Sequence, residues 1–156
     1  MNIKINICML LVLVTSLTFS QSNNEVKYDS VKAQKYGADE YGMKKYVMAF
    51  LKRGPNKDLD SAKRAELMNA HLTNIFRLAD EGKLVLAGPF LNDGELRGIY
   101  IFDVENLDEA KKLTETDPAI QQGTLSMELI PWYGTAALIE VNELSKTLVK
   151  KSILGN

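Results

Sequence analysis

The stretch KKYVMAFLKR, residues 44–53, is typical of a β-strand because it combines β-branched, aromatic and other apolar residues. The sequence GPNKD at residues 54–58 closes it with a turn signal. Residues 60–83 then show the period of an α-helix, which Gly82 ends. The apolar face expected for this helix consists of Leu67, Met68, Leu72, Ile75, Phe76 and Ala79.

The rest of the core is expected to contain three more strands and a second helix. In chain order these are strands at residues 84–91 and 97–104, a helix at residues 107–116 and a strand at residues 124–133. Asp93 and Gly94 suit the tight turn of an antiparallel hairpin. Asn106 is the expected N-cap of the second helix, and Pro118 must stop it. This order predicts an α+β, ferredoxin-like βαββαβ protomer.

Both faces of the predicted sheet are apolar, as residues 46–51 (YVMAFL) and 98–102 (GIYIF) show. The predicted helices cover one face, so something else must cover the second. The pattern favours the sheet of a second copy, which predicts a homodimer. The alternative cover is the C-terminal tail, residues 134–156, expected to be helical. Its apolar positions at helical spacing are Ala137, Val141, Leu144 and Leu148.

Residues 1–20 read as a secretory signal peptide, with Lys4 before a short apolar run and Ser20 at the cleavage site. The mature chain would begin at Gln21 and be exported, either periplasmic or secreted, with no membrane segment after cleavage. An uncleaved membrane anchor is the alternative. Residues 21–43 form a polar N-terminal arm, in which a short helix at residues 29–36 is expected to end at a glycine.

Composition excludes several classes of function. Cys8 lies in the signal, so the mature chain has no thiol, and it has one histidine, which makes a zinc site improbable. We expect no metal and no cofactor. The chain carries a net charge of −1, which gives no electrostatic footprint for nucleic acid.

His71 is the single histidine and lies at the margin of the expected apolar stripe. It is either a packed, hydrogen-bonded core residue or a general acid or base. A base needs an orienting partner, and Asp117 is the candidate, although an Asp before a proline also suits a helix N-cap. Arg64 lies on roughly the same helical side as His71. It is either a surface residue or a contact for an anionic ligand.

Four short segments, in this order and spacing, resemble the YCII-related (YciI-like) family. They are HL at residues 71–72, LVLAGPF at 84–90, DPAIQQG at 117–123 and ELIPW at 128–132. The resemblance covers residues 44–133 and implies a protomer that pairs into a dimeric α/β barrel. It also implies that His71 and Asp117 are the active pair. One characterised type of relative resembles a lyase that removes chloride from a hydroxylated aromatic ring.

Two positions depart from the pattern of many relatives. Met68 stands where they carry an arginine, and Ala119 stands where they carry an aromatic residue after the Asp-Pro pair. The hypothesis is therefore general: a cofactor-free isomerase or lyase in which His71 and Asp117 move a proton on a small cyclic or carbonyl compound. The alternative is a non-catalytic module of the same fold that binds a small molecule or a protein.

Overall fold

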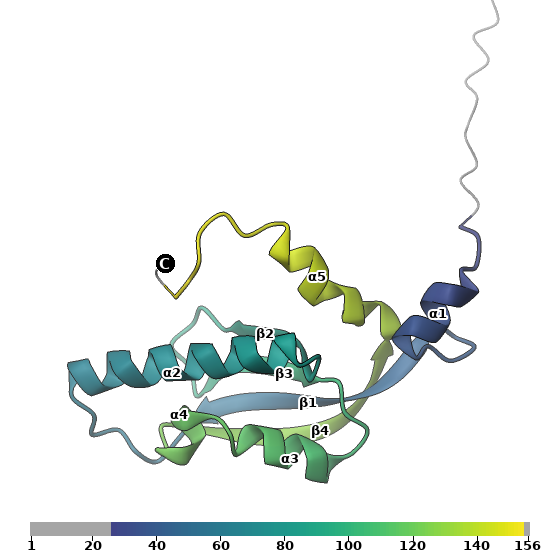
Figure 1. The fold of residues 1–156 in the computed structure, drawn as a ribbon. Helices are drawn as coiled ribbons and strands as arrows, with labels where there is room; N and C mark the ends of the chain where they lie inside the picture. Colours follow the sequence, from purple (N-terminus) through teal and green to yellow (C-terminus); the bar gives the residue numbers. More distant parts are fainter. Residues whose placement is uncertain (1–25, 155–156) are drawn as a thin grey trace, which may run out of the picture.

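The computed structural model describes residues 26–154, which form one antiparallel sheet covered by helices on one face (Figure 1). The strands are β1 (Met43–Arg53), β2 (Leu84–Pro89), β3 (Leu96–Phe102) and β4 (Leu125–Thr135). Their order across the sheet is β2-β3-β1-β4. Helix α2 (Ser61–Asp80) connects β1 to β2, and α3 (Leu107–Thr114) with α4 (Pro118–Gln121) connects β3 to β4. The predicted α+β, ferredoxin-like protomer is confirmed.

Helices α2 and α3 pack on the same face of the sheet and enclose the main core. Leu78 of α2 and Ala110 of α3 are buried there against Val47, Tyr100 and Phe102 of the two central strands. Asn106 caps α3, as expected, because its side chain accepts a hydrogen bond from the Glu109 N–H. The core therefore fixes the spacing between α2 and the segment that follows α3.

The face of α2 that packs on the sheet differs from the expected one. Met68 is 52% exposed and Phe76 is 43% exposed, whereas the buried residues of the helix are His71, Asn74 and Leu78. The expected stripe is wrong at Met68 and Phe76 because it counted only apolar residues, whereas Ile75 does pack against the core. Two polar side chains occupy the buried face here, since residues around Asp117 supply hydrogen-bond partners for them.

The segments that flank the core lie against each other. Helix α1 (Ser30–Tyr36) ends at Gly37, which adopts a φ of 66°, as expected for a glycine C-cap. After β4 the chain forms a 3₁₀ helix, η1 (Ala136–Glu140), and then α5 (Val141–Lys146). The Tyr36 hydroxyl donates a hydrogen bond to the Glu140 carboxylate and so ties α1 to η1.

The C-terminal tail is less helical than expected. Helix α5 ends at Lys146, and Leu148, which was expected on its apolar face, is 76% exposed. The hydroxyls of Ser145 and Thr147 donate to the carbonyls of Asn142 and Leu144, respectively. Such side-chain bonds compete with the helical ladder and favour an early end.

The second face of the sheet is partly covered by this tail. Leu138 and Ile139 of η1 pack against Tyr46, Val85 and Ile101. Beyond this contact, Ile130 remains 42% exposed on the same face. The alternative of a covering tail therefore holds for part of the face, and the homodimer stays a prediction.

The predicted signal peptide at residues 1–20 lies outside the described residues. Within residues 26–154, none of the helices has the length and apolar character needed to cross a bilayer.

Candidate active site

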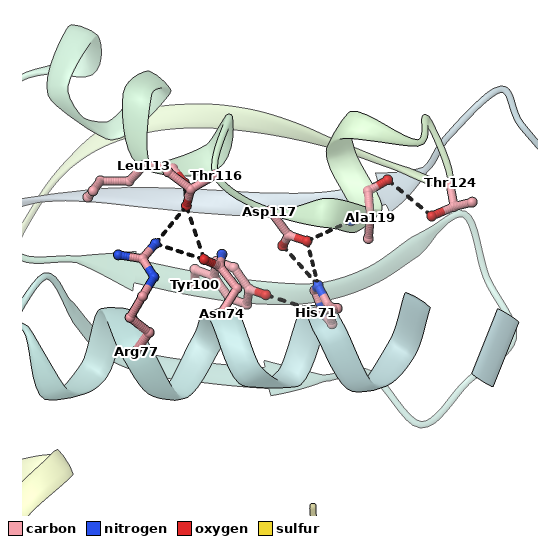
Figure 2. Close-up of polar contacts among 9 residues, drawn as sticks. All are labelled: His71, Asn74, Arg77, Tyr100, Leu113, Thr116, Asp117, Ala119 and Thr124. Atoms are coloured by element: carbon pink, nitrogen blue, oxygen red, sulfur yellow. Dashed lines mark hydrogen bonds and ion pairs between the residues drawn. The ribbon is translucent and has the colours of Figure 1, made fainter. Parts of the chain in front are cut away.

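His71, Asp117 and Tyr100 form a buried chain of polar contacts between α2, the start of α4 and the central strand β3 (Figure 2). The His71 Nδ1 atom lies 2.8 Å from Asp117 Oδ2 and 3.0 Å from Oδ1. On the other side of the ring, the Tyr100 hydroxyl lies 3.3 Å from Nε2. His71 is 8% exposed and Asp117 only 1% exposed. The structure thus brings together the two residues that the sequence nominated, and their catalytic role remains a prediction.

Asp117 also performs the structural task that its sequence context suggested. Its extended backbone places it as the N-cap of α4, and Oδ1 accepts a hydrogen bond of 2.9 Å from the Ala119 N–H. Pro118 occupies the first helical position, where its missing N–H costs nothing. The cap therefore aims the carboxylate at α2, so that one side chain both starts a helix and orients the imidazole.

These partners define the tautomer of the neutral ring. A carboxylate only accepts hydrogen bonds, so Nδ1 carries the proton and donates it to Asp117. Nε2 then presents a lone pair, to which the Tyr100 hydroxyl donates. A distance of 3.3 Å is long for a bond from a hydroxyl, so a reacting group can displace this contact at small cost. The arrangement is that of a general base oriented by a carboxylate.

Tyr100 was missed by the sequence analysis. Burial, and next the negative charge of Asp117, raise the pKa of Tyr100 well above its ordinary value, so the hydroxyl stays protonated and acts as a donor. A tyrosine in the apolar stretch GIYIF carries no signal that separates it from a core residue. Only its register beside His71 identifies it.

A second polar cluster supports the site one turn along α2. The Asn74 Oδ1 atom accepts hydrogen bonds from the Arg77 guanidinium at 2.8 Å and from the Thr116 hydroxyl at 3.1 Å. Thr116 immediately precedes Asp117, so this cluster holds the chain that carries the carboxylate against α2 (Figure 2). The Asn74 Nδ2 atom is buried and has no hydrogen-bond partner among the described residues.

His71 lines a cavity of about 370 Å³ at one end of α2. Its apolar lining includes Leu67, Met68, Ala119 and Leu125. Arg64 also lines it, with its guanidinium donating a hydrogen bond to the Leu59 carbonyl. Met68 and Ala119 thus border the same space as His71. This volume suits a small ligand.

Two other features of the described residues bear on the assignment. A larger cavity, about 550 Å³, lies between α1, the end of α2 and the tail, and its lining includes neither His71 nor Asp117. Within residues 26–154, no three His, Cys, Asp or Glu side chains lie close enough together to hold a metal ion. The cavity beside His71 is the better candidate for chemistry because the imidazole lines it and Asp117 binds that imidazole.

Comparisons with known proteins identify the domain that forms the core of this chain. The model of the YCII-related domain matches residues 45–133. Among solved structures, the chain is similar to 5-chloro-2-hydroxyhydroquinone dehydrochlorinase from Burkholderia phenoliruptrix, solved in complex with 2,5-dihydroxybenzoquinone. That match has 21% identity and a TM-score of 0.43, and it covers 55% of this chain and 92% of the other. No curated protein matches the chain.

Proposed function

The chain belongs to the YCII-related domain family, and we propose that it is a cofactor-free enzyme that transfers a proton on a small cyclic or carbonyl compound. In this proposal His71 is the general base and general acid. Asp117 holds the ring in one tautomer and stabilises the imidazolium. The observation that carries the proposal is the contact of His71 Nδ1 with the Asp117 carboxylate at 2.8 Å, beside a cavity that the same histidine lines.

The proposed step begins when the substrate displaces the long contact with the Tyr100 hydroxyl and meets the lone pair of Nε2. This atom takes a proton from a carbon next to a carbonyl or from a ring hydroxyl, and the electron pair of the broken bond moves onto the substrate. The ring becomes an imidazolium whose charge faces Asp117, and burial strengthens that attraction. Returning the proton to another carbon completes an isomerisation. Expulsion of a leaving group by the same electron pair completes an elimination.

The Tyr100 hydroxyl has a positioning role in this scheme. Its hydroxyl contacts Nε2 at 3.3 Å, and its ring stacks near the imidazole with the ring centroids 6.3 Å apart. When a substrate proton takes its place, the hydroxyl can turn toward developing negative charge nearby. Because it remains protonated, it can stabilise such charge without taking part in the transfer.

Proton exchange tests this function without knowledge of the natural substrate. The purified protein is incubated in D₂O with small cyclic ketones, lactones and hydroxylated aromatic compounds, and NMR follows the loss of acidic C–H signals. We expect catalysed exchange for at least one class. The His71→Asn variant keeps a donor where Nδ1 lies but lacks Nε2, so its exchange rate should fall by about 10²-fold or more.

A matched control separates this effect from a general disturbance of α2. Glu66 is exposed on the same helix and has no ion-pair partner among the described residues, so Glu66→Gln should leave the exchange rate unchanged. Exchange that survives in His71→Asn would exclude His71 as the base. Binding of a compound without any exchange would favour the non-catalytic binding module instead.

We also propose that the protein is exported after cleavage of residues 1–20. The support is the sequence pattern of a short positive start, an apolar run and small residues before Gln21. Mass spectrometry of the protein from the producing cell should find a mature N-terminus at Gln21 in the periplasmic or extracellular fraction. A chain that retains residue 1 in the cytoplasmic fraction would contradict export.

A further inference from the structure

A β-bulge places an arginine in the cavity beside His71. Along β1 and β3, Leu51 pairs with Gly98, but the next residue, Lys52, pairs with Leu96. Arg97 is therefore the extra residue and has no partner in β1, while its carbonyl accepts a hydrogen bond from the Phe90 N–H on the other side of β3. A bulge of this kind turns the extra side chain away from regular alternation and is common next to functional sites. Arg97 accordingly lines the same cavity as His71.

Arg97 belongs to a group of cations around this cavity. Arg53 at the end of β1, Lys57 in the following loop and Arg64 on α2 also line it. Of the described residues that line the cavity, none is an aspartate or glutamate. Clefts lined by charges of one sign raise the local concentration of ligands of the opposite sign. The lining thus favours an anion.

Within residues 26–154, only one carboxylate forms ion pairs with Arg53 and Arg97. Asp93, in the loop between β2 and β3, forms ion pairs with Arg53 and, at 3.2 Å, with Arg97. Its side chain is 91% exposed, so water competes strongly for it. Among the described residues, Lys57 and Arg64 have no carboxylate within ion-pair distance. The group keeps an excess of positive charge.

We propose that this cavity takes a substrate with a carboxylate or a similarly compact anionic group, which Arg97 and Arg53 hold in place of Asp93. Guanidinium groups bind carboxylates through paired, charge-assisted hydrogen bonds. The apolar part of the substrate lies against Leu67, Met68 and Leu125, within reach of His71. This inference rests on the proposed function for the reaction, and it adds the charge of the substrate and the residues that select it.

Benzoate is a suitable probe because it joins an apolar ring to a carboxylate, and benzamide is its neutral counterpart of the same shape. Titration calorimetry on the full-length protein should show that benzoate binds at least about tenfold more tightly than benzamide. Rising ionic strength should weaken benzoate binding alone. The His71 ring signals should shift in NMR spectra when benzoate is added, because the ring lines the same cavity.

Single substitutions assign the charge preference to residues. Arg97→Gln and Arg53→Gln should each raise the Kd of benzoate about tenfold or more and leave benzamide unaffected. Lys111→Gln removes the same charge from an exposed position on α3 that forms no ion pair among the described residues, so it should leave both Kd values unchanged. Asp93→Asn should tighten benzoate binding, because it removes the internal competitor.

Several results would overturn this inference. They are equal affinity for benzoate and benzamide, no measurable benzoate binding, binding that does not move the His71 signals, and an unchanged Kd in both arginine variants although they remain folded by circular dichroism. Weaker benzoate binding in Asp93→Asn would show that Asp93 positions the arginines and does not compete with the ligand. Benzoate binding without proton exchange on any compound would retain the anion site and reject the catalytic proposal. Proton exchange on neutral compounds alone would support the catalytic proposal and reject the anion site.

Discussion

Asp117 combines two tasks within one buried carboxylate, which caps α4 and binds the His71 ring. Its sequence context, an aspartate before a proline, predicts only the helix N-cap. The role beside His71 depends on the distance between α2 and the start of α4, which the sequence cannot measure. At the scale of single residues, the sequence could therefore nominate His71 and Asp117 by residue type. It could not nominate Tyr100 or Arg97, because strand register and a bulge decide where those side chains point.

Removal of the imidazole should reveal how strongly Asp117 depends on it. In His71→Ala the buried carboxylate loses the hydrogen-bond donor that Nδ1 supplies, and the free energy of unfolding should fall by about 1–3 kcal/mol. In His71→Asn the side-chain amide can still donate where Nδ1 lies, so the loss should be clearly smaller. Chemical denaturation of both variants measures the difference. Equal losses would show that the ring contributes by packing alone.

At the scale of elements, the four strands and the two main helices of the core were predicted to within a few residues, because their boundaries depend on local signals such as turns, caps and prolines. The buried face of α2 was not predicted correctly. His71 and Asn74 are buried only because Asp117 and Thr116, more than forty positions away, satisfy them. Hydrophobic periodicity contains no information on such distant partners, so it placed the stripe over Met68 and Phe76.

A close contact between two loops fixes the wall of the cavity at Gly54. A Cβ atom there would lie 2.1 Å from the Gly123 carbonyl oxygen, so the Gly54→Ala variant must displace backbone. We expect a loss of about 1–3 kcal/mol in the free energy of unfolding. Gly88→Ala is the matched control, since nothing lies within 4 Å of its Cβ position, and its effect should stay within about 0.5 kcal/mol. Equal effects in thermal or chemical denaturation would show that the loops can separate freely.

At the scale of the whole molecule, the segments outside the family core close on each other through Tyr36 and Glu140. The hydrogen bond to Glu140 is the largest cause that raises the pKa of Tyr36 from 10.0 to about 12. The folded protein therefore holds this proton more tightly than the unfolded chain does. The stabilisation is complete below pH 10 and is lost as the pH rises toward 12.

This linkage predicts a specific alkaline loss of stability. Between pH 10 and 12 the free energy of unfolding should fall more steeply in the wild type than in Tyr36→Phe, which lacks the titrating hydroxyl. Denaturation curves at several pH values measure both slopes. The other tyrosines are present in both proteins, so their contributions cancel in the comparison. Parallel slopes would show that the contact between α1 and η1 does not depend on the Tyr36 proton.

The remaining apolar part of the second face leads to a prediction of assembly. Ile130 is 42% exposed there and is the strand partner of Met48. Light scattering coupled to size exclusion should give twice the mass of one chain at micromolar concentration. The Ile130→Lys variant should have the mass of a single chain. Val26→Lys, at a position 99% exposed in the arm, should leave the mass unchanged. A wild-type monomer would show that η1 covers enough of the face, and the barrel model would fail.

The pairing of His71 with Asp117 is tested most directly by the protons on the two ring nitrogens. Nitrogen–proton NMR correlations can report them at a pH where the ring is neutral, and the single histidine makes assignment unnecessary. In the wild type we expect the proton on Nδ1 and the lone pair on Nε2. In Asp117→Asn the side-chain amide can donate to Nδ1, so the proton should move to Nε2. A wild-type ring protonated on Nε2, or a tautomer that does not change in the variant, would contradict the proposed catalytic pair.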